Sequence, residues 1–481
     1  MNKLITKYKK LPKPLKATLW FTLISVLQRG ISFLAVPIFT RIMTTEQYGT
    51  YSVFLSWLEI FEIVTTFRLG WGGYIVGLTK FDDDRDRYTS SMQCLSLVIT
   101  GAFMLLYLPL SGILNGFTGM DNGLTFMMFG IMFALPAIQF WTVRGRVEYR
   151  YIAVFAVTMI ASVLTIGLGT IFAVAFEDKV EMVVAARVIV QGIEAAILIW
   201  INCHKDFCFY HKGYWKRAFK FNVPLLPYYL SMVLLHSSDR IIIRNLIGAA
   251  QAGIYGVAYT ASMCMQIFST AFNQTLQPWM YKKMKDGNIK SVKNIINMAL
   301  LVVAVLNLLM IALAPEVVRI MAPKAYHEAI WVIPPLCASV VVMFFDQHFV
   351  NIEFYFEESK LTAAASIGAA VLNIALNHIF VPIYGYFAAG YTTLASYLVF
   401  AFAHYLFMRI VCRKHNYTER LVDIRMMLLI LVAFFICTAV LMVGYEYAVI
   451  RYIAAAVIAI GLILNRKKLM KILKRTRVKK A

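Results

Sequence analysis

Residues 19–51 read LWFTLISVLQRGISFLAVPIFTRIMTTEQYGTY, and this stretch holds the strongest clues to the fold of the chain. Its apolar part is about as long as a helix that crosses roughly 30 Å of hydrocarbon. One cation, Arg29, lies near the middle of that part, and a short polar turn follows it. The stretch therefore predicts a membrane-spanning helix, a polar turn and the start of a second apolar helix.

A related turn returns in the second half of the chain as RNLIGAAQAGIYGVAY, residues 244–259. The residues that the two turns share lie 204 positions apart, namely Gln47 and Gln251, Gly49 and Gly253, and Tyr51 and Tyr255. This spacing predicts a duplicated chain. Because each half holds six apolar segments, an even number, the two halves have the same orientation, which is a parallel repeat.

The composition indicates a helical membrane protein. Of the 481 residues, 60% are hydrophobic and 15% are charged, whereas a soluble domain is closer to half apolar and a quarter charged. No run alternates with period two, so the fold class that we predict is all-α and polytopic. We expect about fourteen membrane-spanning helices, near residues 17–39, 49–70, 90–112, 122–143, 151–175, 182–203, 221–245, 252–276, 294–314, 328–351, 361–382, 386–408, 424–444 and 447–464.

The predicted organisation is two bundles and a tail, with a central cavity that opens alternately to either side. We expect a six-helix bundle over 1–204, a cytoplasmic linker over 205–220, a second six-helix bundle over 221–411, an extra helix pair over 412–464 and a basic tail over 465–481. Lysine and arginine gather in alternate loops, and the positive-inside rule then places both termini in the cytoplasm. The net charge of +22 therefore reports topology, and no loop is large enough for a nucleic-acid-binding domain.

Several kinds of chemistry are missing from the sequence. It has no GxxxxGK[ST] phosphate loop and no HExxH or GxSxG motif. Its seven cysteines lack the spacing of a zinc site. We therefore expect no cofactor, no metal and no enzymatic activity.

Charged residues inside the spans are the candidate functional residues, since a charge near the bilayer centre costs about 3 kcal/mol on insertion scales. Arg29 is the first candidate for contact with a substrate, because its own helix has no acidic neighbour; the glutamates of the next span are its alternative partners. Arg187 and Glu194 share one helix face, either as a structural pair or as a site. The candidates for ion or proton coupling are Glu59, Glu62, Glu194, Asp346 and His348.

The segments PIFTRIMTTEQYGTY and DRIIIRNLIGAAQAGIYGVAY resemble those of bacterial polysaccharide-biosynthesis flippases, which belong to the multidrug/oligosaccharidyl-lipid/polysaccharide exporter superfamily. The resemblance implies a multi-pass protein of the bacterial inner membrane that flips a polyprenyl diphosphate carrying an oligosaccharide repeat unit. Its partners would be membrane lipids, a polysaccharide polymerase and glycosyltransferases. We hypothesise that Arg29 contacts the diphosphate, with Arg187 and Arg240 as further candidates, since a guanidinium binds phosphate oxygens in pairs.

Three other functions stay open on the sequence alone. A multidrug or cation antiporter of the same superfamily would have a cavity dominated by acidic residues. A flippase for the lipid-linked peptidoglycan precursor has a similar architecture. A structural scaffold for a glycan-synthesis complex would tolerate any cavity substitution that leaves folding intact.

Overall fold

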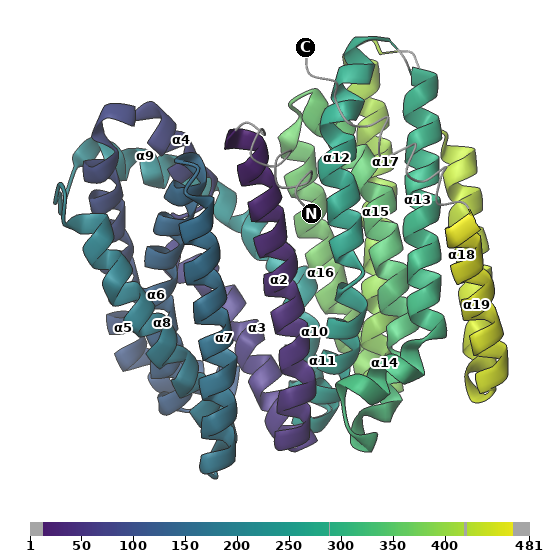
Figure 1. Ribbon diagram of the computed structural model, residues 1–481, viewed down its shortest axis with the longest axis horizontal. Helices are drawn as coiled ribbons and strands as arrows, with labels where there is room; N and C mark the ends of the chain where they lie inside the picture. Colours follow the sequence, from purple (N-terminus) through teal and green to yellow (C-terminus); the bar gives the residue numbers. More distant parts are fainter. Residues whose placement is uncertain (1–12, 288, 418–420, 465–481) are drawn as a thin grey trace, which may run out of the picture. The chain divides into compact units, whose positions relative to one another are not determined.

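The computed structural model describes residues 13–287, 289–417 and 421–464, and these residues are almost entirely helical (Figure 1). The prediction of an all-α fold is confirmed, and none of the described residues forms a β-strand. Two compact units divide the chain, Met1–Val233 and Leu234–Ala481. The basic tail predicted at 465–481 lies outside the described residues.

Eleven of the described helices are long and apolar enough to cross a membrane. The count of fourteen is not confirmed, although the three remaining predicted spans are helical as well. The span predicted at 49–70 is α3 (Thr45–Thr66), which is less apolar than the others. The span predicted at 252–276 is interrupted and forms α11 (Ala249–Met263) and α12 (Gln266–Lys285). The last predicted span is α19 (Ala448–Leu464), whose apolar part is shorter.

The N-terminal unit is a bundle in which α6 packs against α8, α8 against α7, and α7 against α2 (Figure 1). Helix α7 exposes Ile160, Val163 and Ile171, as expected of a surface that faces lipid. Besides α3, the helical elements of this unit are α2 (Lys13–Ile42), α4 (Gly72–Lys80), η1 (Asp82–Asp84), α5 (Arg85–Thr118), α6 (Asn122–Val147), α7 (Tyr151–Ala175), α8 (Lys179–Cys203), α9 (Lys212–Asn222) and η2 (Val223–Leu225).

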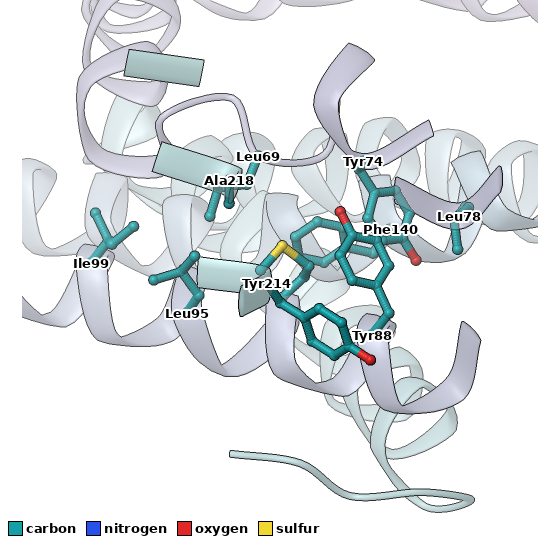
Figure 2. Close-up of a cluster of buried hydrophobic side chains, with 10 residues drawn as sticks. Leu69, Tyr74, Leu78, Tyr88, Leu95, Ile99, Phe140, Tyr214 and Ala218 are labelled. Carbon is teal, nitrogen blue, oxygen red and sulfur yellow. The ribbon is translucent and has the colours of Figure 1, made fainter. Parts of the chain in front are cut away.

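A cluster of buried rings fixes the two short helices of this unit (Figure 2). Tyr74 of α4 lies 4.7 Å from Phe140 of α6, and Tyr214 of α9 lies 5.2 Å from Tyr88 of α5, measured between ring centroids. A Cβ atom at Gly77 would come within 2.1 Å of the Tyr88 hydroxyl, so a glycine is needed for this close approach. Helix α9, which lies within the segment predicted as a linker, is thus packed onto the N-terminal unit.

The C-terminal unit is built around α15 (Ile333–Tyr355), the most deeply buried of its long helices. Helices α11, α12, α13, α16, α17 and α18 all pack against it. Helix α10 (Leu226–Leu246) begins in the first unit and continues into this one. The remaining elements are α13 (Ile289–Ala312), α14 (Ala314–Met321), η3 (Lys324–Trp331), α16 (Ser359–Tyr384), α17 (Phe387–Lys414), α18 (Ile424–Val443) and η4 (Gly444–Glu446).

The duplicated turn is reproduced in the helix boundaries. Helix α2 ends at Ile42 and α3 begins at Thr45, while α10 ends at Leu246 and α11 begins at Ala249. Both pairs of boundaries are 204 residues apart, as the sequence repeat predicts.

The two copies of the turn begin the following helix in different ways. In the first copy, Thr44 and Gln47 form a reciprocal capping box, with hydrogen bonds of 3.0 and 3.2 Å. In the second copy, Gly248 occupies the equivalent position with φ of 148°, a conformation that only glycine adopts readily.

Candidate functional site

A helix break in the N-terminal unit positions its main polar cluster. Helix α3 ends at Thr66, and Phe67 and Arg68 follow in the left-handed conformation, with φ of 50° and 46°. For residues other than glycine, that conformation costs roughly 1–2 kcal/mol each, and such strain concentrates at functional sites. A Cβ atom at Gly70 would lie 2.7 Å from the Gln139 side chain, so the chain passes closely over α6 before α4 begins.

The break places the Arg68 guanidinium beside two aromatic rings. Its central carbon lies 4.5 Å from the centroid of Trp71 and 5.2 Å from that of Tyr229, the latter on the first turn of α10. Both distances fall within the range of cation–π attraction. The Arg68 Nε atom is buried and has no hydrogen-bond partner. The geometry therefore holds a cation with unused hydrogen-bonding capacity.

A carboxylate and a second arginine complete this group. Gln139 Nε2 donates a 2.7 Å hydrogen bond to Glu62 Oε1, and both Arg68 and Arg187 interact electrostatically with Glu62. We call Glu62, Arg68, Gln139, Arg187 and Tyr229 the N-terminal polar cluster. Its residues come from α3, the helix break, α6, α8 and α10, which are separate in sequence. The cluster combines two guanidinium groups with a carboxylate held by an amide.

The other candidate residues that the sequence predicts in the N-terminal unit are Arg29, Glu59 and Glu194, which are not members of this cluster. Arg29 lies on α2, but its side chain is outside the described residues. Glu59 is exposed and interacts electrostatically with Glu62. Glu194 is half-buried, and no ion pair joins it to Arg187 in the described part of the chain; Arg187 instead has its Nε 3.4 Å from Gln191 Oε1.

In the C-terminal unit, Asp239 is the centre of a fully buried hydrogen-bond network. Its Oδ2 accepts hydrogen bonds from Tyr255 at 2.5 Å and from Thr393 at 2.8 Å, and its Oδ1 accepts one from Asn377 at 2.7 Å. Asn373 donates to Thr393 at 3.2 Å. The network joins α10, α11, α16 and α17 around one carboxylate, which accepts hydrogen bonds from two hydroxyl groups and one amide nitrogen.

Arg240 lies beside this network rather than in it. Its Nη2 donates to Ser237 at 3.3 Å, and its guanidinium carbon is 5.0 Å from the Tyr259 ring centroid. Its Nε is buried without a hydrogen-bond partner. Arg240 and Asp239 interact electrostatically. The Asp239 carboxylate therefore partly compensates the positive charge of Arg240 within the C-terminal unit.

A second buried group lies on α15 and α17. His404 Nδ1 is 2.7 Å from Glu353 Oε1, and Thr362 donates to Glu353 Oε2 at 2.8 Å. Asp346, one of the predicted coupling residues, interacts electrostatically with both members of this pair and has one carboxylate oxygen without a partner. His348 is also buried and packs against Phe344, with 4.9 Å between ring centroids.

An ion pair ties α14 to α19. Arg451 Nη1 lies 2.8 Å from Glu316 Oε2, and Tyr452 donates to Glu316 Oε1 at 3.0 Å. Burial alone would raise the pKa of the Glu316 carboxyl. The hydrogen bonds and positive charge of Arg451 outweigh that effect and hold this pKa below its usual value.

No cluster in the described residues has the composition of a transition-metal site. No three histidine, cysteine, aspartate or glutamate side chains in that part of the chain converge to hold an ion. The seven cysteines are free thiols.

Sequence reasoning missed several members of these groups. Glu353 was not singled out at all, because its partner His404 is 51 residues away on another helix. Asn373 and Asn377 lie four residues apart on α16, but their acceptors are on α17 and α10, which leaves no local pattern. Arg68 did have a signal, since the glycines of RLGWGG, residues 68–73, mark the helix break.

Comparisons with known proteins agree on one class of membrane protein. A family model described as "Polysaccharide biosynthesis protein" matches residues 15–284, more than half of the chain. Two proteins of Haemophilus influenzae are each 22% identical: an "Uncharacterized membrane protein" over 354 residues (70% of this chain, 77% of that protein), and "Lsg locus putative protein 1" over 366 residues (73% and 80%).

Solved structures share the fold. The lipid II flippase MurJ, in an inward closed conformation, covers 94% of this chain and 100% of its own, with a TM-score of 0.68 and 12% identity. An inward-facing multidrug resistance MATE transporter of the MOP superfamily covers 82% and 96%, with a TM-score of 0.58 and 16% identity. At these identities the likeness is one of fold.

Proposed function

This chain belongs to the polysaccharide biosynthesis protein family and is a multi-pass membrane transporter or flippase rather than an enzyme, and from that premise we propose its cargo and its direction of transport. The cargo is an oligosaccharide repeat unit linked to a polyprenyl diphosphate. It moves from the cytoplasmic to the outer leaflet of the bacterial inner membrane for surface polysaccharide synthesis, by alternating access. Both termini are cytoplasmic, and a polymerase and glycosyltransferases act on the same lipid-linked sugars.

The physical problem of this cargo matches the chemistry of the N-terminal polar cluster. Each unpartnered sugar hydroxyl costs several kcal/mol in hydrocarbon, so the head group needs a polar route while the lipid tail stays in the bilayer. The diphosphate needs cations that remain inside the membrane. Arginine serves this purpose because its planar fork binds two phosphate oxygens at once.

The observation that carries the proposal is the position of Arg68. It lies at a helix break, its guanidinium faces two aromatic rings, and its Nε lacks a partner. We assign the first contact with the diphosphate to Arg68 and Arg187, with Arg29 and Arg240 as further candidates. Glu62 and Gln139 hold the cluster in place when no anion is bound.

The energy for export comes from an ion gradient or from the membrane potential. An interior-negative potential favours outward movement of an anion by about 2.3 kcal/mol per charge per 100 mV. For ion or proton coupling we keep Glu59, Glu62, Glu194, Asp346 and His348 as candidates. We add Glu353 and His404, whose fully buried pair lies next to Asp346.

The test is export in a host strain that lacks the chromosomal gene and carries a plasmid copy at matched expression. We expect Arg68→Ala to lower export about tenfold or more, the effect of losing a charged hydrogen-bond donor. Lipid-linked oligosaccharide then accumulates on the cytoplasmic face, and Arg68→Lys restores export only in part. The matched control is Arg146→Ala, because Arg146 also faces a ring, Phe21 at 5.6 Å, but lies outside the cluster.

Three outcomes would contradict the proposal. Full export by Arg68→Ala would remove this residue from the substrate site, and the Arg29→Ala and Arg29→Lys pair then tests the first sequence candidate. If deletion of the gene leaves the lipid-linked sugar pools unchanged but abolishes drug resistance, the protein is a multidrug antiporter. Accumulation of the peptidoglycan precursor alone would identify it as a flippase for that lipid.

A further inference from the structure

A pocket lies at the end of α17 where the chain turns into α18, within the C-terminal unit. It encloses about 520 Å³, a volume typical of sites for small ligands. Its lining combines cationic, aromatic and apolar side chains, including Tyr405, Met408, Arg409, Arg413, Tyr417 and Val422. It shares no residue with the N-terminal polar cluster or with the buried networks around Asp239 and Glu353.

The two arginines of the pocket present their charges to the same space. Arg409 and Arg413 are four residues apart on α17, so they share a helix face, and both are exposed. None of the described residues that line the pocket is acidic. In the described ranges neither arginine takes part in an ion pair. The described lining therefore carries two positive charges and no negative charge.

Two carboxylates described in the flanking chain serve other partners. Glu358 forms an ion pair with Lys414 and lies 3.6 Å from His415 Nε2. Asp423 caps α18 by accepting a 3.2 Å hydrogen bond from the backbone N–H of Met426. Neither of these two carboxylates forms an ion pair with a pocket arginine in the described ranges.

The shape of the pocket is fixed by the end of α17. Asn416 has φ of 53°, the Tyr417 N–H donates to the Cys412 carbonyl at 2.8 Å, and the Asn416 N–H donates to the Arg413 carbonyl at 3.1 Å. This pair of hydrogen bonds is the Schellman arrangement that ends helices. It holds one wall of the pocket, and the buried side chains of Met408 and Val422 give the lining an apolar part.

We propose that this pocket binds a phosphate-bearing group, with the phosphate oxygens held by Arg409 and Arg413 and the apolar remainder against Met408 and Val422. Paired guanidinium groups one turn apart match the geometry of a phosphate or diphosphate. The pocket lies at the end of α17 that the positive-inside rule places on the cytoplasmic side. Two sources supply this chemistry there, the headgroup of an anionic phospholipid and a soluble diphosphate compound.

The experiment measures ligand binding to the purified full-length protein in a zwitterionic detergent. Phosphatidylglycerol is titrated by native mass spectrometry, with phosphatidylcholine as the neutral comparison, and inorganic pyrophosphate is titrated by calorimetry. The variants are Arg409→Ala, Arg413→Ala and the double Arg409→Lys/Arg413→Lys. Arg425→Ala is the matched control, since it removes one exposed arginine of α18 that does not line the pocket.

We expect the Kd of the phosphate ligand to rise about tenfold in each alanine variant and less than about twofold in Arg425→Ala. The double lysine variant keeps both positive charges but loses the planar guanidinium groups that bind two phosphate oxygens at once. Its affinity for the phosphate ligand therefore falls between those of the wild type and the alanine variants. Binding of phosphatidylglycerol alone assigns the pocket to lipid, and binding of pyrophosphate alone assigns it to a soluble phosphate compound.

The proposal is overturned if neither probe binds, if phosphatidylcholine binds as tightly as phosphatidylglycerol, or if Arg425→Ala weakens binding as much as the pocket variants. Because both pocket arginines are exposed, their loss leaves the fold intact, and equal melting temperatures verify this. Export activity is not the readout, so this test and the test of the proposed cargo can fail independently.

Discussion

The carboxylate of Glu353 has no exposed surface and accepts hydrogen bonds from His404 and Thr362. In a helical bundle that spans a membrane, a buried charge is costly unless it is paired. When one member of a buried pair is removed, the other is left uncompensated, at a cost of about 3–5 kcal/mol. The pair therefore makes a large contribution to the folding of the C-terminal unit.

We predict that Glu353→Ala and His404→Ala each lower the free energy of unfolding by about 3 kcal/mol. The double variant is expected to lose less than the sum of the two, because each single change strands the partner of the other. Thermal unfolding in detergent measures all three. Glu358→Ala is the control, since its partner Lys414 is solvent-exposed. Additive losses in the double variant would show that the two residues act independently.

At the scale of the residue, the sequence identifies polar side chains inside spans but not their partners. Asp346 and His348 lie within a helix, as the sequence predicts. The partner of Arg187 was not predicted: Arg187 on α8 interacts electrostatically with Glu62 on α3, more than a hundred residues earlier in the chain. Hydrogen bonds between helices depend on rotation and depth of each helix, which local composition does not encode. Arg68 shows the opposite case, because its glycine-rich neighbourhood was readable as a break.

At the scale of the element, Glu316 and Arg451 connect α14 to α19, the last described helix. The pKa of Glu316 is lowered in the folded protein. Its contribution to stability is therefore fully present above the pKa of the unfolded chain. It disappears as the pH falls through the lower pKa of the folded state.

We predict that the melting temperature of the wild type exceeds that of Glu316→Gln by a constant amount above about pH 5, and that this difference shrinks below about pH 4. The measurement is thermal unfolding of both proteins across that range. Glu446→Gln, an exposed acid at the end of η4, serves as the control. A difference that stays constant down to the lowest pH would mean that the Glu316–Arg451 pair does not stabilise the fold.

Helix boundaries were predictable wherever an apolar run ends in a polar turn. The spans predicted to start at residues 49 and 252 follow the turns after α2 and α10, and the helices begin there at Thr45 and Ala249. Prolines were less informative: α2 continues through Pro37 and α6 through Pro136. The actual interruptions fall at residues 67–71 and 264–265, and neither segment contains a proline.

At the scale of the whole molecule, the class was predictable because hydropathy alone separates a polytopic helical protein from a soluble one. The number of membrane spans could not be predicted from hydropathy. Helix α3 mixes glutamates and hydroxyl groups with apolar residues, and α11 and α12 share one apolar run. Composition cannot decide whether such segments cross the bilayer, since protein neighbours instead of lipid can cover their polar faces.

We predict that both termini lie in the cytoplasm. Green fluorescent protein fused to either end should fluoresce, and alkaline phosphatase fused to the C-terminus should be inactive. A phosphatase fused after Asp178, in a loop poor in lysine and arginine, should be active as the matched control. An active C-terminal phosphatase would contradict the cytoplasmic location of that end.

The repeated helix boundaries also have an evolutionary consequence. An interval of 204 residues that is kept at two helix ends and two helix starts indicates that one ancestral gene segment was copied and joined to itself. Tyr51 and Tyr255 occupy equivalent positions of the repeat, yet the position equivalent to Asp239 in the first copy is Ala35. The buried acid is thus present in one copy only. The two copies share their helix boundaries and differ in the chemistry that those helices carry.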